Sequence, residues 1–385
     1  MKGLVEAFTL PRWIEAEPGC IAKSGYWAKK FGTRAMVVSG RTAARKFGLL
    51  DKIEKSLKDA GIPYEIFDRV GREPEIETSE EGAELARKTG CDVFIAVGGG
   101  SVLDTTKLTA MLIENPGRAE EYQLAQREWT EPCKPWIAIP TTAGTGSEAT
   151  KVSVMTNKRL NVKKGVYSWE MVSTVALLDA ETNVHMPPEL TRDTGLDALG
   201  QSIEGYLSTG NNEIIAAAAM RAVRLVHEYL PRAVKDGKDI EARHNMLLAG
   251  LMGGVSIDTG VGLGHEMAMA VGSYKGISHG LLVGVLTPWC LEPSLGYADK
   301  RLGELADAFD CTHDEPEIKA RCFIELVRDF QKQVGCPSGL GELGVKREDI
   351  GPILEASKLS TNIGTNPRPL DDEIRSETLA AAIGG

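Results

Sequence analysis

Short runs rich in Val and Ile alternate with helical patterns over the first half of the chain, and this alternation limits the possible folds. The apolar runs are RAMVVSG (34–40), PYEIFDRV (63–70), DVFIAVGGG (92–100) and PWIAIPTT (135–142), with VSVMT (152–156) and VALLDA (175–180) as further candidate strands. Helical periodicity separates them at 41–61 and 78–90. Such an alternation predicts βαβ units and a mainly parallel sheet.

The second half of the chain has a different hydrophobic pattern. From Thr191 onward the chain contains long apolar or amphipathic helical runs, such as 211–234 and 242–257, with little that alternates like a strand. This pattern predicts a helical bundle. A chain of 385 residues is longer than a single core usually grows. We therefore predict an α/β plus all-α protein, with a Rossmann-like parallel-sheet domain over 1–186 and a helical domain over 187–385, joined near a Pro-Pro pair.

Charge and cysteine content narrow the function classes. The net charge of −10 repels nucleic acid and anionic membranes, so we expect neither as a partner. The cysteines are odd in number and scattered without CxxC spacing, which predicts buried, unpaired thiols in a reducing compartment; they are Cys20, Cys91, Cys133, Cys290, Cys311, Cys322 and Cys336. Acids and prolines interrupt the N-terminal segment where a signal peptide needs an apolar run, so a cytoplasmic location is expected.

Three glycines, Gly98, Gly99 and Gly100, directly follow an apolar strand and precede a helix expected to start near Ser101. Glycine lets a phosphate approach the backbone, and the free N–H groups of a helix start attract negative charge. The segment therefore suits a pyrophosphate. Because its spacing is not GxGxxG, an ordinary loop remains an alternative.

A second polar turn, IPTTAGTGSEAT (139–150), also follows an apolar strand. Its hydroxyl groups belong to Thr141, Thr142, Thr145, Ser147 and Thr150. Open α/β sheets bind their ligands at the carboxyl ends of their strands, so two such loops favour a dinucleotide site. Some of these hydroxyls could instead cap turns.

The loop after the first strand bears on the choice of cofactor. Sites that select NAD usually place a carboxylate on the ribose at this position, whereas a 2′-phosphate needs small groups and a cation. Here Ser39, Gly40, Arg41 and Thr42 occupy the loop, with no acid. We therefore favour NADP(H) over NAD(H), with an ordinary surface arginine as the alternative reading of Arg41.

Four side chains in the second half raise the question of a metal site. Asp197 and Gln201 are four residues apart on one face of a predicted helix, and His265 and His279 follow in GHEMAMAVGSYKGISHG. Together with GGGSVLDTTK, PTTAGTGSEAT, TGLDALGQSIEGY and TNPRPL (365–370), this segment resembles the iron-activated alcohol dehydrogenase family, in order and over nearly the whole chain.

The resemblance implies a dinucleotide-binding α/β domain, a helical domain, and a cleft between them where a divalent metal polarises an alcohol or carbonyl oxygen. This architecture is shared with 3-dehydroquinate synthase, and the family commonly forms homodimers. Residues that match the family's cofactor contacts are Gly99, Gly100, Ser101 and Asp104 in the phosphate loop, Thr141, Thr142 and Thr150 in the second loop, and Lys163. The first-loop acid of NAD-using members falls at Gly40, in agreement with NADP(H).

The resemblance also implies metal ligands. Asp197, His265 and His279 match three of them and are the catalytic candidates, while Gln201 stands where the family has a histidine. An amide oxygen is a weaker ligand than imidazole, but one carboxylate and two imidazoles still bind Fe²⁺, so we expect Fe²⁺ or Zn²⁺ with reduced affinity. Loss of the metal is the alternative.

A further departure concerns proton transfer. Members often carry a second histidine four residues after the first, and here that position is Met269. Methionine cannot usefully donate or accept a proton. The relay would then fall to a water, to the cofactor ribose hydroxyl, or to Glu266.

The resemblance thus implies hydride transfer between NADP(H) and a small aldehyde or primary alcohol. Three alternatives are a metal-independent reductase like the maleylacetate reductases, a lyase related to 3-dehydroquinate synthase, and a non-catalytic NADP-binding relative. Gln201 and the lack of a denser Lys, His and Glu ligand set count against the lyase. Substrate identity and physiological direction have no signature in these motifs.

Overall fold

The computed structural model describes residues 8–160, 162–358 and 364–384. By its internal contacts the chain divides into two compact units. The sheet unit comprises Thr9–Thr142 and Gly146–His185, and the helical unit contains Ala143–Thr145 and the described residues from Met186 onward. The assignment of Ala143–Thr145 to the helical unit had no counterpart in the sequence patterns.

Within the described residues, a parallel six-stranded sheet forms the centre of the sheet unit, as predicted. Its order is β1 (Trp13–Glu15), β8 (Val175–Leu177), β5 (Trp136–Pro140), β4 (Val93–Gly98), β2 (Ala35–Gly40) and β3 (Tyr64–Val70). Strands β4 and β5 are buried along their whole length, which explains their unbroken apolar runs.

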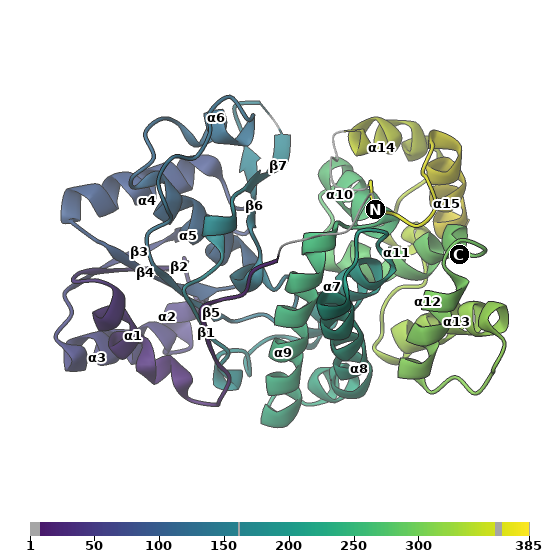
Figure 1. Cartoon of the computed structure of the whole chain (residues 1–385), viewed down its shortest axis with the longest axis horizontal. Helices are drawn as coiled ribbons and strands as arrows, with labels where there is room; N and C mark the ends of the chain where they lie inside the picture. The colour runs from purple at the N-terminus through teal and green to yellow at the C-terminus, as the bar shows by residue number, and fades with distance from the viewer. Residues whose placement is uncertain (1–7, 161, 359–363, 385) are drawn as a thin grey trace. The chain divides into compact units, whose positions relative to one another are not determined.

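Helices cover both faces of this sheet (Figure 1). Val37 and Ile95 face the core made with α1 (Ser24–Phe31) and α3 (Leu49–Ala60). Met36 and Phe94 face the opposite core, made with α4 (Ile76–Thr89) and α5 (Gly100–Leu112). The side chains of each strand thus alternate between two apolar layers, as period-two geometry requires.

Some elements differ from the prediction. The expected strand at 152–156 forms β6 (Val152–Asn157), but it pairs antiparallel with β7 (Val162–Tyr167) outside the main sheet. The expected helix at 41–61 is divided into α2 (Ala43–Lys46) and α3, because Gly48 between them has a φ of 71°. A left-handed residue of this kind interrupts a helix.

The helical unit confirms the predicted bundle (Figure 1). Its helices are α7 (Pro188–Leu207), α8 (Glu213–Lys235), α9 (Ile240–Ser256), α10 (Leu263–Lys275), α11 (His279–Leu291), α12 (Asp299–Ala306), α13 (Pro316–Gln333), α14 (Ile350–Ser357) and α15 (Asp372–Gly384). Helix α7 packs against α8, α9 and α11. A Cβ on Gly200 would lie 2.4 Å from Val283 Cγ1, so glycine lets α7 and α11 approach closely.

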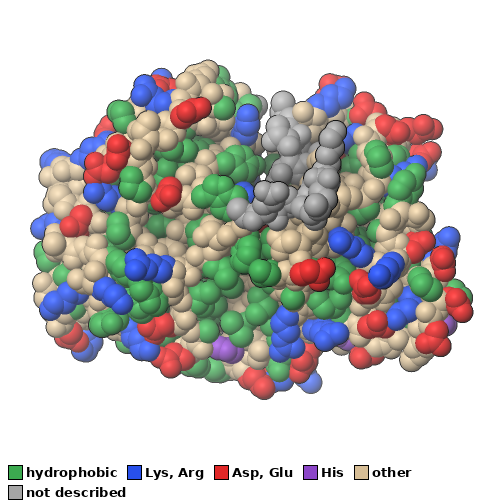
Figure 2. Space-filling model, in the orientation of Figure 1, with side chains coloured by type: hydrophobic (Ala, Val, Ile, Leu, Met, Phe, Trp, Pro, Cys, Tyr) green, Lys and Arg blue, Asp and Glu red, His purple; other side chains and the backbone are tan. Residues whose placement is uncertain are grey.

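Figure 2 shows acidic and basic side chains interspersed on the visible face of each unit. No single helix in the described ranges is long and apolar enough to cross a membrane, although the pair Ile240–Thr259 and Leu263–Lys275, bent by 100°, passes jointly by length and composition.

Candidate metal centre and cofactor loops

Three helices bring Asp197, His265 and His279 together. Asp197 lies in the middle of α7, His265 in the first turn of α10, and His279 is the first residue of α11. One ligand atom from each lies within 4.8 Å of the others. Residues far apart in the chain thus form the carboxylate and two-imidazole set expected from the sequence.

The geometry of this cluster suits a cation. Asp197 Oδ1 lies 3.6 Å from Nε2 of both His265 and His279, and it is buried with no hydrogen-bond partner. Burial alone would raise the pKa of Asp197, but the two imidazoles outweigh it and lower the pKa. The side chain of His279 is 37% exposed, so the cluster has an open side. A buried, unpaired carboxylate oxygen between two imidazoles is a fitting donor set for a divalent metal.

Glu204, which sequence reasoning missed, orients His265. Its Oε2 lies 2.6 Å from His265 Nδ1, and its carboxylate also accepts hydrogen bonds from the backbone N–H groups of Gly262 (2.8 Å) and His265 (3.1 Å). An Nδ1–H donated to a carboxylate leaves the Nε2 lone pair for a metal. Glu204 lies seven residues after Asp197, on the same helix face, and this spacing could have revealed it.

These carboxylates also act on the imidazole. Burial alone would lower the pKa of His265, but Glu204 and Asp197 outweigh it and raise the pKa to about 10. A bound cation would take the place of this proton at Nε2, because a metal-ligating histidine is neutral.

Gln201, at the fourth predicted position, is buried, and its Nε2 donates a hydrogen bond to the Gly144 carbonyl oxygen at 2.7 Å. A carbonyl oxygen only accepts hydrogen bonds, so this contact fixes which way the amide is turned. The amide oxygen is the atom of Gln201 that could act as a ligand. Its role as the fourth ligand stays a prediction.

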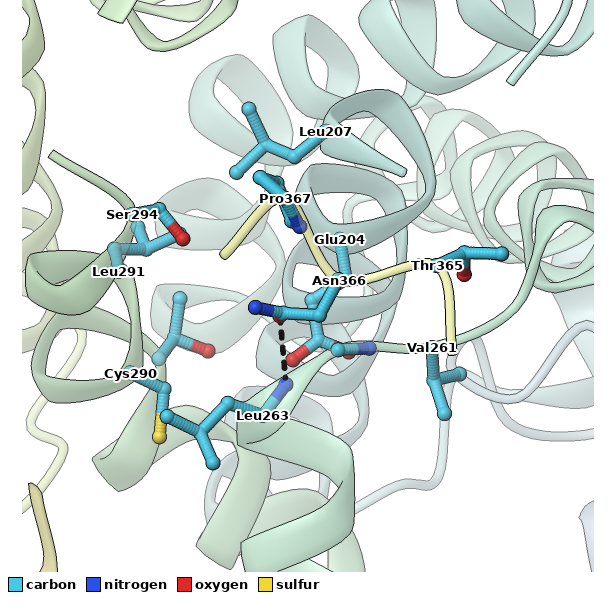
Figure 3. Close-up of a pocket in the computed structure, with 12 residues that line it drawn as sticks. Glu204, Leu207, Val261, Leu263, Cys290, Leu291, Ser294, Thr365, Asn366 and Pro367 are labelled. Carbon is cyan, nitrogen blue, oxygen red and sulfur yellow. Dashed lines mark hydrogen bonds between the residues drawn. The ribbon is translucent and has the colours of Figure 1, made fainter. Parts of the chain in front are cut away.

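A pocket adjoins Glu204 at the start of α10 (Figure 3). Its lining includes Glu204, Leu263 and Asn366. Within it, Asn366 Oδ1 accepts a hydrogen bond from the Leu263 backbone N–H at 3.3 Å. Asn366 belongs to the TNPRPL segment, so this motif helps to satisfy the free N–H groups at the helix start that positions His265.

Glu266 follows His265 in the chain, but its carboxylate is turned to α15. Its Oε1 accepts a hydrogen bond from Arg375 Nε at 3.0 Å, and the residue is only 1% exposed. This ion pair holds Oε1 toward α15, while Oε2 is buried with no hydrogen-bond partner. Neither oxygen has a contact that would pass a proton on, which argues against the suggested role of Glu266 as proton relay.

The two glycine- and threonine-rich loops lie side by side at the carboxyl ends of β4 and β5. The Thr141 N–H donates to the Gly98 carbonyl oxygen at 2.9 Å, and a Cβ on Gly99 would lie 3.2 Å from Thr142 Cγ2. Gly99 is the N-cap of α5 and Gly100 its first residue. The loops therefore present backbone N–H groups of a helix start at the edge where open α/β sheets bind phosphates.

Asp104 and Thr150 take part in the internal structure of these loops. Asp104 accepts hydrogen bonds from the Ser147 hydroxyl (2.5 Å) and the Val154 N–H (2.9 Å). Thr150 is buried, and its hydroxyl accepts from Lys107 Nζ at 3.0 Å. The geometry thus gives both residues a positioning task, and their direct contact with cofactor stays a prediction.

Lys107 is a second residue that sequence reasoning missed. Its ammonium is fully buried and donates to the carbonyl oxygens of Ser147 (2.7 Å), Thr150 (3.1 Å) and Val152 (2.8 Å). Burial lowers the pKa of Lys107, and Asp104 opposes the shift. A single side chain from α5 thus holds the second loop against the first.

Lys107→Met is expected to lower the free energy of unfolding by about 3 kcal/mol or more, because several buried acceptors lose their donor. Chemical denaturation would measure this. Lys55→Met is the matched control: Lys55 is 77% exposed and pairs with Asp59 on α3, so its loss should cost less than about 1 kcal/mol. Equal losses in the two variants would contradict the role assigned to Lys107.

The remaining predicted cofactor residues lie at the edges of this region. Ser39 is buried, Gly40 ends β2, and the exposed Arg41 donates from Nε to the Arg69 carbonyl oxygen at 3.3 Å. Ser101 donates its hydroxyl to the Arg72 carbonyl oxygen at 2.6 Å. The Lys163 ammonium on β7 forms an ion pair with Glu73 at 2.7 Å.

Two family models match most of the chain. Residues 11–180 match the family model "Iron-containing alcohol dehydrogenase", and residues 191–383 match "Fe-containing alcohol dehydrogenase family, C-terminal". The chain is 32% identical to alcohol dehydrogenase 4 of Schizosaccharomyces pombe, over 97% of this chain and 88% of that protein. It is 33% identical to the NAD-dependent methanol dehydrogenase of Bacillus methanolicus, over 91% and 92% of the two chains.

The fold also matches that of a solved structure over nearly the whole chain. The crystal structure of a 1,3-propanediol oxidoreductase superposes with a TM-score of 0.94 at 30% identity, covering 98% of this chain and 99% of that chain. The family resemblance read from the motifs is thereby confirmed. The chain belongs to the iron-containing alcohol dehydrogenase family, and it is an alcohol oxidoreductase that uses a nicotinamide cofactor.

Proposed function

We propose that this protein is a metal-dependent alcohol dehydrogenase or aldehyde reductase that transfers hydride between NADP(H), its preferred cofactor, and a small aldehyde or primary alcohol. The observation that carries the proposal is the buried Asp197 Oδ1, which has no hydrogen-bond partner and lies 3.6 Å from both imidazoles. Asp197, His265 and His279 would hold the metal, with Gln201 as a weaker fourth ligand. A bound divalent metal supplies Lewis-acid polarisation of the substrate oxygen.

The chain's own groups supply orientation and charge. Glu204 keeps the Nδ1 proton of His265 on the side away from the ligand atoms, so that Nε2 faces Asp197. The negative charge of the Glu204 carboxylate would also balance part of the charge of a metal ion bound at His265 Nε2. The α5 start at Gly99 and Gly100 and the loop held by Lys107 would bind the cofactor phosphates.

The test is NADPH oxidation with a panel of short aldehydes, measured together with metal content before and after chelation. We expect bound Fe²⁺ or Zn²⁺, activity lost on chelation, and activity restored by Fe²⁺ or Zn²⁺. Activity that survives complete metal removal would favour the metal-independent alternative. Tight NADPH binding without turnover of any aldehyde, in metal-loaded protein, would favour the non-catalytic one.

Gln201→His should tighten metal retention, because imidazole is a better ligand for these ions than an amide oxygen. The measurement is metal content after dialysis against a graded series of chelator concentrations. Gln201→Leu, which removes the amide but offers no ligand, is the control and should weaken retention. Unchanged retention in both variants would place Gln201 outside the ligand set.

The cofactor preference rests on the acid-free loop after β2. Gly40→Asp should favour NADH over NADPH by at least about tenfold in the ratio of dissociation constants, because a carboxylate repels the 2′-phosphate and binds the ribose. A Cβ at Gly40 meets only ordinary contacts, at 3.8 Å to the Val70 carbonyl oxygen and 4.0 Å to Val102 Cγ2. Arg41→Asp should act in the same direction. Equal weakening of both cofactors would overturn the NADP(H) assignment.

A homodimer and a cytoplasmic location complete the proposal, with no nucleic-acid or membrane partner. The net charge of −10 supports the last point. The homodimer is supported by the family's common assembly, and sedimentation velocity would test it.

A further inference from the structure

Two of the cysteines are in contact. Cys311, in the segment after the short helical turn Asp307–Phe309, lies with its Sγ 3.0 Å from Sγ of Cys322 on α13. Non-bonded sulfur atoms usually stay farther apart. Both residues are partly exposed. The prediction of buried thiols is therefore wrong for this pair and for the partly exposed Cys133, whereas all three are free thiols, as predicted. The contact itself was not predicted, because the spacing of the two cysteines in the chain carries no signature of it.

Packing around the pair fixes the positions of the two thiols relative to each other. Phe309 lies 5.5 Å from both Phe323 and Phe330 of α13, measured between ring centroids and with edge-to-face geometry. The Cys311 N–H donates to the Ala306 carbonyl oxygen at 3.1 Å. Both sides of the thiol contact are thus anchored to the core, so the sulfurs meet through tertiary packing and not through a freely moving loop.

The other cysteines are poorly placed for reaction. Cys20, Cys91, Cys290 and Cys336 are buried, and Cys133 directs its Sγ toward the Lys107 carbonyl oxygen at 3.8 Å. Burial raises the pKa of Cys20 to about 12 and that of Cys336 to about 12. Thiolate is the reactive form, so these groups should resist modification.

We propose that Cys311 and Cys322 are a redox modification site, at which a low-molecular-weight disulfide such as oxidised glutathione converts the two thiols to one intramolecular disulfide. One Cys thiolate attacks a sulfur of the oxidant, which forms a mixed disulfide and releases one glutathione thiolate. The second Cys thiolate then attacks the protein sulfur of the mixed disulfide and releases the second glutathione. Two electrons pass to the oxidant, and the two thiol protons end on the two glutathione molecules.

The contact favours completion of the second step. A mixed disulfide at either cysteine would have the partner sulfur beside it, so glutathione should not accumulate on the protein. Burial and then the neighbouring Cys311 raise the pKa of Cys322 to about 11, so little of it is thiolate at neutral pH. Its part in the second step rests on the contact of its Sγ with the Cys311 sulfur. Closing the bond would join the segment that follows Phe309 to α13.

The experiment equilibrates the full chain with buffers of fixed reduced-to-oxidised glutathione ratio, blocks free thiols with an alkylating reagent, and identifies the modified peptides by mass spectrometry. The expected result is a cross-linked peptide pair containing Cys311 and Cys322, whose fraction rises with the oxidant ratio and is reversed by dithiothreitol. Both cysteines alkylated at every ratio, or glutathione retained on either of them, would overturn the proposal.

Two variants make the test specific. Cys322→Ser should trap glutathione on Cys311 as a stable mixed disulfide, and Cys311→Ser should trap it on Cys322 more slowly. Cys133→Ser is the matched control and should leave the cross-link unchanged. A cross-link from Cys311 or Cys322 to any other cysteine in the unaltered chain would also contradict the assignment.

Discussion

Asp197→Asn should abolish metal retention and lower kcat/KM by about 10³-fold or more. Asparagine keeps the shape of the side chain but removes the charge that two imidazoles surround, and Lewis-acid stabilisation of a developing alkoxide contributes several kcal/mol. Metal content by elemental analysis and steady-state kinetics would measure both effects. Asp193→Asn, one turn earlier on α7, is the control: Asp193 pairs with the adjacent Arg192 and should leave metal content unchanged. Full activity in metal-free Asp197→Asn would contradict the assigned ligand.

Glu204→Gln should weaken metal affinity or activity by about 10- to 100-fold, the usual cost of removing a carboxylate that orients a metal-ligating histidine. The carboxylate accepts the Gly262 N–H at Oε2 and the His265 N–H at Oε1. An amide has only one acceptor oxygen, so one of these backbone bonds should persist while the hold on the His265 Nδ1 proton weakens. Titration with a competing chelator would measure the affinity.

The chain offers a closely matched control in Glu266→Gln. The side chains of Glu266 and Glu204 are 1% and 10% exposed, and Glu266 follows the same histidine in sequence, yet its carboxylate pairs with Arg375. We expect this variant to lose stability but to keep its metal affinity. If both variants lose metal equally, the effect of Glu204 is general damage to α10 and not orientation of His265.

The sequence allowed prediction of those strands and helices whose formation depends on a continuous stretch of residues. Strands β4 and β5 were recognisable because strands buried on both faces need unbroken apolar runs. By contrast, β7 was missed because its sequence VKKGVY carries two lysines on a partly exposed hairpin. The division of the expected 41–61 helix was also missed, because it depends on the backbone conformation of one residue, Gly48, which the sequence pattern does not show.

The candidate site divides in the same way. Asp197, His265 and His279 were found because their residue types have a chemical signature within recognisable motifs. Glu204 and Lys107 were missed because a carboxylate or a lysine on a helix is most often solvated, and only the folded chain shows what it holds. The Cys311 and Cys322 contact has the same origin: packing between Phe309 and α13 creates it.

The placement of Ala143–Thr145 has a consequence for how separable the two units are. These three residues belong to the helical unit although sheet-unit sequence lies on both sides of them. A gene fragment beginning at Met186 would therefore lack Gly144, and Gln201 would lose the carbonyl that fixes its amide. The helical unit is thus not a transferable module: any recombination or truncation that keeps the candidate ligands intact must also carry a short stretch encoded more than forty positions upstream of Met186.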